Sequence, residues 1–403
     1  MRIARHRYDL AVPSTTAVVS APPRVAALTG IRAFAALLVL LTHAAYWTGH
    51  YTDDYLGRLL ARAEIGVALF FVLSGYLLFR PWARAALHPT SELPSTTTYF
   101  THRVRRVLPA YWITVVVVYA IYAVRDHAGS SVTRWLPAEA STYGAGLSGF
   151  IRNMTLTQVY GFGHLHAGLT QMWSLAAEVV YYLMLPPLAW FLVVLVSRRT
   201  PTSGWRPDLL IAGLVALMLI SPAWTFAVAI GSGADATARL WAPAFVAWFA
   251  AGMMLAVCRD LVRRWPALPS VGLAVILLAV SATPIAGGPT IIPDTAAQTV
   301  VKHLLYLVIS VALIGPLVFG TDDAWTRLCA ARPVVWLGEI SYEVFLVHVI
   351  VLELVMAALR YRVFGGDSML IVTVVTALLS VPLAWGLHRI TAPVWRRNRR
   401  RST

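Results

Sequence analysis

The segment "GIRAFAALLVLLTHAAYW", residues 30–47, is almost entirely apolar, yet it contains an arginine and a histidine. It is close to the roughly 20 residues that a helix needs to cross the hydrocarbon core of a membrane. Apolar runs of this kind recur up to residue 390, and 58% of the chain is hydrophobic, against roughly 45–50% in soluble domains. The sequence therefore predicts an all-α, polytopic integral membrane protein.

The distribution of basic residues predicts the topology of this protein. We expect about ten transmembrane helices, at 29–48, 64–83, 107–124, 171–196, 209–229, 239–257, 268–285, 302–320, 333–358 and 369–390. If the N-terminus is cytosolic, the inner segments hold 22 Lys and Arg residues and the outer segments hold nine. Since cytosolic loops carry the excess of basic residues, both termini are expected in the cytosol.

This topology defines three parts of the chain. Residues 1–28 and 391–403 are expected to be basic cytosolic tails, and residues 29–390 the transmembrane domain of a multi-pass inner (plasma) membrane protein. The longest loop, about 125–170, is expected outside. The formal charge of +15 then reflects topology and contact with lipid headgroups rather than nucleic-acid binding. Cys258 and Cys329 both fall near the cytosolic face, so we expect free thiols.

Arg32 and His43 of the opening segment are eleven residues apart, which is about three helical turns, so they share one face. Arg32 lies near the cytosolic end, and His43 lies about 20 Å deep, in the outer half of the bilayer. An ionisable residue buried in a span indicates a functional site. The alternative is a neutral histidine that forms a hydrogen bond between helices.

Two distant segments place ionisable groups at a similar depth. In "WSLAAEVVYYLMLP", residues 173–186, Glu178 is expected near the level of His43, and in "ISYEVFLVHVIVL", residues 340–352, His348 is expected there too. Two imidazoles and a carboxylate at one level would form an acid–base site. Separate hydrogen bonds between helices are the alternative interpretation.

Two further segments carry polar residues inside or beside a span. "FFVLSGYLLFRPW", residues 70–82, places Ser74 and Gly75 in mid-span, where Gly permits close helix packing and Ser can form an interhelical hydrogen bond. "YFTHRVRRVLPAYW", residues 99–112, places three arginines just before a span and two aromatic residues at the interface: Arg103, Arg105, Arg106, Tyr111 and Trp112. The arginines suit either an orientation anchor or a phosphate-binding site.

Five groups of residues match the motifs of a known family in type, spacing and order. They are Arg32, Ala35, Ala36, Val39 and His43; Phe70, Phe71, Ser74, Gly75 and Tyr76; Arg103, Arg106, Pro109, Tyr111 and Trp112; Trp173, Ser174, Leu175, Glu178, Tyr181, Tyr182, Leu183 and Pro186; and Leu337, Gly338, Ser341, Tyr342 and His348. The chain thereby resembles the membrane-bound acyltransferase-3 family, which acylates sugars, lipids and polysaccharides. It departs from the motifs at Ala68, where an acidic or polar residue is common, at Phe345, where Tyr is usual, and after His348, where no proline follows.

The resemblance implies an acyl-CoA-dependent O-acyltransferase that moves an acyl group, expected to be acetyl, from the cytosolic donor to an envelope sugar or glycolipid. A trehalose mycolate-type lipid is one candidate acceptor. The implied catalytic residues are His43, Glu178 and Ser174; the donor-binding residues are Arg32, Arg103, Arg106, Tyr111 and Trp112; and the substrate-pocket residues are Ser74, Trp173, Tyr342 and His348. No metal and no permanently bound cofactor is expected. Direct transfer and an acyl-histidine intermediate both stay open, as does the oligomeric state.

Two other functions fit a membrane protein with intramembrane Arg, His and Glu. A transporter or flippase uses such residues as a substrate or proton path, but we find no internal repeat of the kind that many secondary transporters show. A non-catalytic scaffold of an envelope complex would not need these residues at all. Binding of acyl-CoA separates the enzyme from both alternatives.

Overall fold

The computed structural model describes residues 23–88, 91–127, 146–161, 163–197, 206–231, 236–259, 261–262, 264–290, 295–320 and 323–396. These residues form helices joined by loops, and no strand occurs among them. The all-α prediction is therefore confirmed. Most of the two expected tails, at 1–22 and 397–403, and residues 128–145 of the expected outer loop lie outside the described residues.

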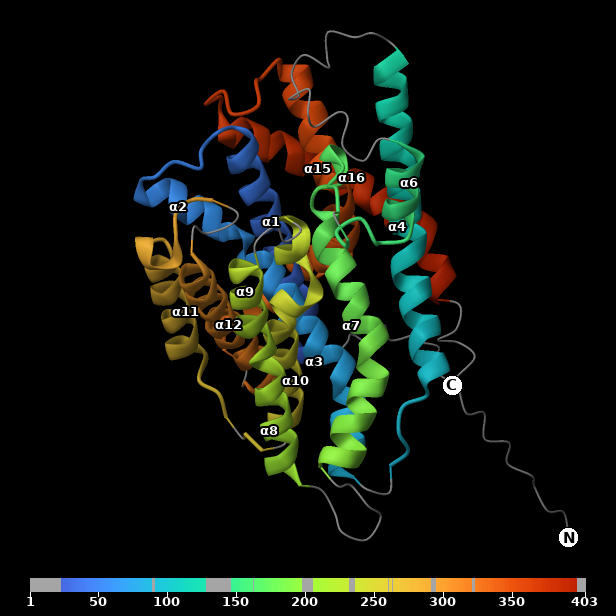
Figure 1. Cartoon of the computed structure of the whole chain (residues 1–403), viewed down its shortest axis with the longest axis vertical. Helices are drawn as coiled ribbons and strands as arrows, with labels where there is room; N and C mark the ends of the chain where they lie inside the picture. Colours follow the sequence, from blue (N-terminus) through green and yellow to red (C-terminus); the bar gives the residue numbers. More distant parts are fainter. Residues whose placement is uncertain are drawn as a thin grey trace, which may run out of the picture.

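The helices follow one another along the chain and pack into a bundle (Figure 1). The longer ones are α1 (Pro23–Trp47), α3 (Ile65–Leu87), α4 (Thr96–His127), α7 (Met172–Trp190), α8 (Pro207–Met218), α9 (Ile220–Ile230), α10 (Val246–Cys258), α11 (Ala267–Ser281), α12 (Ala296–Phe319), α15 (Ser341–Leu359) and α16 (Met369–Arg396). The shorter ones are α2 (Tyr55–Ala61), α6 (Leu147–Met154), α13 (Ala324–Ala330), α14 (Arg332–Glu339) and the 3₁₀ or π segments η1 (Arg62–Glu64), η3 (Ala167–Leu169), η4 (Phe191–Val196), η5 (Ala236–Leu240), η6 (Ala242–Phe245) and η7 (Pro284–Ala286).

Seven helical segments of the described chain are long and apolar enough to cross a membrane. They are Ala26–Trp47, Thr96–Val124, Met172–Val196, Pro207–Ile230, Ala296–Phe319, Ser341–Leu359 and Met369–Trp395. The other expected spans fall on α3 and on two shorter apolar helices, Ala242–Cys258 and Ala267–Ser281. The chain is thus a multi-pass membrane protein, while the count of about ten spans and the cytosolic termini stay predictions.

Two helices have different bounds from the spans expected there. The span expected at 333–358 is divided into α14 and α15 at Ile340, where the Ser341 hydroxyl donates to the Gly338 carbonyl oxygen at 2.8 Å. The helix that contains the span expected at 107–124 begins earlier, at Thr96, because α4 continues as one helix of 32 residues. Arg103 and Arg106 therefore lie inside α4, three residues apart on the same helix.

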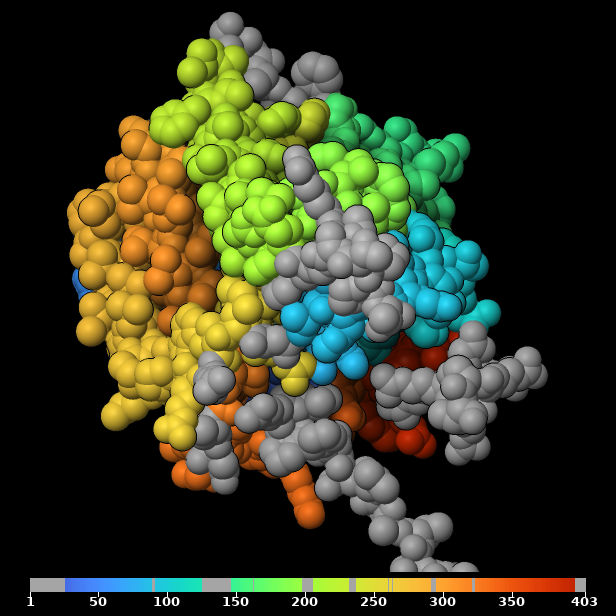
Figure 2. Space-filling view, turned by 90° about the horizontal axis from the view of Figure 1, so that it is seen from below, coloured from blue at the N-terminus to red at the C-terminus, as the bar shows by residue number. Residues whose placement is uncertain are grey.

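The bundle has two ends. At the α2 end, the Phe364 amide donates to the Trp47 carbonyl oxygen at 2.9 Å, and the Arg62 guanidinium donates to the carbonyl oxygens of Ser281 and Gly287, each at 2.7 Å. Arg62 is fully buried, so it ties the loop after α11 to η1. At the opposite α8 end, seen in Figure 2, the starts of α4 (cyan), α8 (green) and α11 (yellow) are exposed. The predicted topology places the α8 end in the cytosol.

The two cysteines are free in the structure, as expected. Cys329, in α13, is fully buried, and burial raises the pKa of its thiol to about 12. Since the thiolate is the reactive form, Cys329 is a poor probe for topology experiments.

Helices α3 and α10 approach closely because each presents a glycine to the other. A Cβ atom on Gly75 would collide with the backbone carbonyl oxygen of Phe249, and a Cβ on Gly252 would collide with that of Val72. Both obstacles are backbone atoms, which cannot rotate away as a side chain can. The expected role of Gly75 in close packing is confirmed.

Gly75→Ala is therefore expected to separate α3 from α10 and to destabilise the protein by about 1–3 kcal/mol, the usual cost of overpacking. The thermal unfolding temperature of the purified protein in lipid nanodiscs measures this change. Gly272→Ala is the matched control, because a Cβ on Gly272 of α11 meets no atom within 4 Å and Ala favours the helix. An unchanged unfolding temperature for Gly75→Ala would contradict the packing argument.

Candidate active site

The imidazoles of His43 and His348 are in contact in the centre of the fold. Helix α1 carries His43 and packs against α3, α14 and α15, and α15 carries His348. The His348 Nε2 atom lies 3.2 Å from the His43 Nδ1 atom, and the ring centroids are 5.1 Å apart. The structure thus joins the two imidazoles that the sequence analysis placed at one depth.

Backbone carbonyls determine the tautomer of both rings. The His43 Nδ1 atom lies 2.7 Å from the Val39 carbonyl oxygen, and the His348 Nδ1 atom lies 2.8 Å from the Phe345 carbonyl oxygen. Because a carbonyl oxygen only accepts, each Nδ1 carries the proton in the neutral ring. The Nδ1–H group of His43 then donates to two acceptors, the Val39 carbonyl oxygen and the unprotonated Nε2 atom of His348.

This arrangement leaves the Nε2 atom of His43 unprotonated and available. It forms no hydrogen bond within the described part of the chain, and His43 is not fully buried. His348, in contrast, is only 1% exposed. His43 is therefore better placed than His348 to contact a substrate. His348 orients the His43 ring through the hydrogen bond between them.

Glu178 of α7 has different partners from those expected. Its Oε1 atom accepts a hydrogen bond of 2.5 Å from the Ser74 hydroxyl of α3, and Tyr182 lies beside the same carboxylate. Glu178 makes no hydrogen bond to either imidazole within the described residues. The structure thus brings together Ser74 and Glu178 from two motifs, as a pair separate from the histidine pair.

The three arginines expected to bind the donor lie around a group of acidic and aromatic side chains. Arg32 is within electrostatic reach of Arg106, Glu178 and Glu343. The Arg103 guanidinium lies 6.0 Å from the ring centroid of Tyr182. Arg32 and Arg106 thus repel each other, and an anion bound between them would relieve this repulsion.

Arg106 is held by residues that the sequence analysis did not assign to the site. Its guanidinium lies 4.6 Å from the Trp395 ring centroid and 3.9 Å from the carboxylate of Glu343. Glu343 is 1% exposed and accepts a 2.9 Å hydrogen bond from the His388 ring. Helix α16, through His388 and Trp395, thus helps to position Arg106.

Ser174 and Tyr342 use their hydroxyl hydrogens within the protein. Ser174 donates to the Gln171 carbonyl oxygen at 3.2 Å, and Tyr342 donates to the Val107 carbonyl oxygen at 3.0 Å. Gln171, which the sequence analysis missed, donates to the carbonyl oxygens of Phe345 and Leu346 at 3.3 and 3.0 Å. It therefore ties the start of α7 to the helix turn that precedes His348.

Tyr111 and Trp112 hold α6 against α4. The buried Tyr111 hydroxyl donates to the Asn153 carbonyl oxygen, and the Trp112 indole donates to the Met154 carbonyl oxygen at 3.0 Å. The packing role of both side chains is thus visible, and their contact with the donor stays a prediction. Trp173 lines a pocket at the α2 end that is described below.

Comparison with known proteins assigns the family. Residues 25–389 match the model of the acyltransferase-3 family, which is described as an acyltransferase domain. The chain belongs to the acyltransferase-3 family. This match includes the helices that carry the residues discussed above, apart from the last residues of α16 with Trp395, so the acyltransferase-3 assignment applies to the membrane bundle.

Two relatives of this acyltransferase-3 chain carry names that describe their reactions. It is 26% identical over 337 residues to the peptidoglycan O-acetyltransferase OatA of Listeria monocytogenes, covering 80% of this chain and 49% of the relative. It is 25% identical over 373 residues to the acyltransferase MdmB of Streptomyces mycarofaciens, covering 86% of this chain and 83% of the relative. The match thus spans about half the length of the Listeria protein. No solved structure matches this chain.

Proposed function

We propose that the protein transfers an acyl group, expected to be acetyl, from acyl-CoA to a hydroxyl of a sugar-containing acceptor in the cell envelope. The observation that carries this proposal is the available Nε2 atom of His43, on an imidazole whose tautomer the Val39 carbonyl and His348 determine. The family assignment and the names of the two relatives support the reaction class.

The proposed chemistry begins with proton abstraction by His43. Its Nε2 takes the proton of the acceptor hydroxyl while the hydroxyl oxygen attacks the thioester carbonyl carbon. The C–S bond breaks, and the CoA thiolate leaves and takes the proton back from the His43 imidazolium. The products are one ester and one free CoA thiol. The positive charge that His43 carries in between is stabilised because its Nδ1–H points at two acceptors, the Val39 oxygen and the His348 Nε2.

Arg32, Arg103 and Arg106 are proposed to bind the phosphates of CoA. Guanidinium groups form strong, charge-assisted hydrogen bonds with phosphate oxygens. Arg32 and His43 share one face of α1 and are about 16 Å apart along it. The pantetheine arm of CoA would cover this distance, past Ser74 and Glu178, with the phosphates toward the α8 end. That end faces the cytosol, where acyl-CoA is made, in the predicted inner-membrane topology.

The nature of the acceptor is proposed from the relatives. One of them is named for O-acetylation of peptidoglycan, a sugar polymer. An envelope glycolipid such as a trehalose mycolate has the same type of hydroxyl. Both acceptors present sugar rings at the outer side of the membrane, where the α2 end is predicted to lie.

The wild-type protein in lipid nanodiscs tests the proposal. Acetyl-CoA is added, and free CoA thiol is measured with and without a muropeptide or glycolipid extract. We expect thiol release that increases when the extract is present. A transporter or a scaffold would leave acetyl-CoA intact, so the absence of any thiol release with either extract would contradict the proposal.

A further inference from the structure

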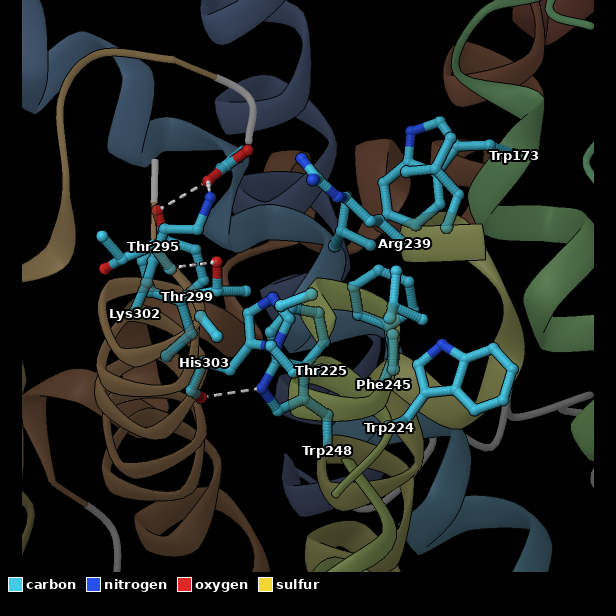
Figure 3. A pocket seen from close by; sticks show the side chains of 18 residues that line it. Trp173, Trp224, Thr225, Arg239, Phe245, Trp248, Thr295, Thr299, Lys302 and His303 are labelled. Atoms are coloured by element: carbon cyan, nitrogen blue, oxygen red, sulfur yellow. Dashed lines mark hydrogen bonds and ion pairs between the residues drawn. The ribbon is translucent and has the colours of Figure 1, made fainter. Parts of the chain in front are cut away.

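A pocket of about 180 Å³ lies at the α2 end, between η1, α3, α7, α9, η5, η6, α10 and α12 (Figure 3). Apart from Trp173, none of its lining residues belongs to the motifs described above. The pocket is smaller than the roughly 300–1,000 Å³ of sites for drug-sized ligands. Its size suits one sugar ring better than a lipid chain.

One wall of the pocket is aromatic. The Phe245 ring centroid lies 5.1 Å from that of Trp173 and 5.1 Å from that of Trp248, and Trp224 lines the pocket beside them. The indole N–H groups of Trp224 and Trp248 both donate to backbone carbonyl oxygens at 2.9 Å. These bonds hold the indoles in place. Rigid aromatic faces of this kind pack against the apolar C–H face of a sugar ring.

Hydrogen-bonding groups line the rest of the pocket, and among them the His303 ring contacts Phe245 and Trp248. Glu64 accepts at its Oε1 atom from Lys302 at 2.8 Å and from Tyr306 at 3.0 Å. Its Oε2 atom and both ring nitrogens of His303 form no hydrogen bond within the described chain, although these residues line the pocket. Sugar hydroxyls are natural partners for such groups.

One cation of the described pocket lining makes no ion pair with another described residue. Lys302 is 3% exposed and its charge is balanced by Glu64. Arg239 is exposed, has no ion pair among the described residues, and directs its guanidinium into the pocket in Figure 3. Among the described residues that line the pocket, the charges of Glu64, Lys302 and Arg239 sum to one positive charge, which an acidic ligand would neutralise.

The pocket is linked to the histidine pair. Glu64 is close enough to His43 for the two to interact electrostatically. Trp173 is in the first turn of α7, the helix that Gln171 ties to the residues before His348. A sugar in this pocket would thus contact a carboxylate that interacts electrostatically with the proposed base, on the side of the bundle where the acceptor is expected.

We propose that this pocket binds the acceptor by one acidic sugar ring, which packs on the aromatic wall and pairs its carboxylate or phosphate with Arg239. This inference rests on the proposed function, since it names the substrate class that the acyltransferase accepts. Arg239 is then the residue that distinguishes acidic acceptors from neutral ones, because a planar guanidinium binds carboxylate or phosphate oxygens in pairs.

Saturation-transfer-difference NMR on the purified protein in lipid nanodiscs tests the proposal. The probes are methyl β-D-glucuronide, methyl β-D-glucoside and glucose 1-phosphate, which compare a carboxylate, no charge and a phosphate. We expect at least one acidic probe to bind about tenfold more tightly than the neutral one, which corresponds to ~1.4 kcal/mol. Arg239→Gln is expected to remove this preference, and Arg239→Lys to keep part of it.

Arg362→Gln is the matched control, because Arg362 is an exposed arginine at the α2 end outside the pocket. Three outcomes would each overturn the proposal. All three probes bind equally, none of them binds at millimolar concentration, or Arg239→Gln keeps the preference for the acidic probe. Probe binding does not require turnover. A protein that binds acidic sugars but leaves acetyl-CoA intact would contradict the proposed function alone, and an active protein without the preference would contradict this inference alone.

Discussion

His43→Ala is expected to lower the rate of acyl transfer by about 10²–10⁴-fold, the usual contribution of a general base. The acceptor hydroxyl is a weak nucleophile until a base removes its proton. His348 is not placed to replace His43 in this role, because His348 is buried. Release of CoA thiol by the purified variant in nanodiscs, in the presence of the acceptor that the wild type uses, measures the effect.

The protein should remain folded after this change, since only one interhelical hydrogen bond is lost. The unfolding temperature of His43→Ala should therefore stay near that of the wild type. His88→Ala is the control, because His88 is exposed at the end of α3 and far from the pair in sequence. If His43→Ala transferred the acyl group at the wild-type rate, His43 could not be the general base.

Replacing Arg103 or Arg106 by alanine is expected to raise the KM for acyl-CoA about tenfold. Replacing both is expected to raise this KM further. Each charge-assisted hydrogen bond to a phosphate contributes roughly 1.5–3 kcal/mol, and the lower value applies because neither arginine is fully buried. About 1.4 kcal/mol corresponds to a factor of ten. Lysine at either position should restore part of the affinity, because it has the charge without the planar fork.

Arg105→Ala is the matched control for this pair. Arg105 has the same charge on the same helix, but it makes no ion pair and no ring contact among the described residues. If the arginines act only as orientation anchors, all three variants should change expression or orientation to a similar degree. An unchanged KM in both Arg103→Ala and Arg106→Ala, over a range of salt concentrations, would exclude the phosphate site.

Helical periodicity explains why part of this site could be predicted. The eleven-residue spacing of Arg32 and His43 predicts a shared face, and depth along a span placed His43 and His348 at one level. Depth does not determine which way a side chain points around its helix. For this reason the contact of the two histidines and the pairing of Ser74 with Glu178 appear only when the helices are packed.

Other features have no local signal in the sequence. The pocket at the α2 end is lined by residues from eight helical segments, so no motif marks Arg239 or Trp248 as part of it. Glu343 stands in a segment that was recognised, but its partners Arg106 and His388 come from α4 and α16. The break at Ile340 has no proline at that position to mark it; it coincides with the hydrogen bond from Ser341 to the Gly338 carbonyl oxygen.

The fate of an isotope-labelled acetyl group tests the central claim most directly. Purified wild-type protein and His43→Ala are incubated in nanodiscs with labelled acetyl-CoA and envelope extract, and mass spectrometry follows the label after an acid quench. We predict that the wild type forms one labelled sugar ester for each free CoA beyond the background hydrolysis, and that His43→Ala forms almost none. The account would be contradicted if His43→Ala formed as much labelled ester as the wild type. It would also be contradicted if the wild type formed no labelled ester.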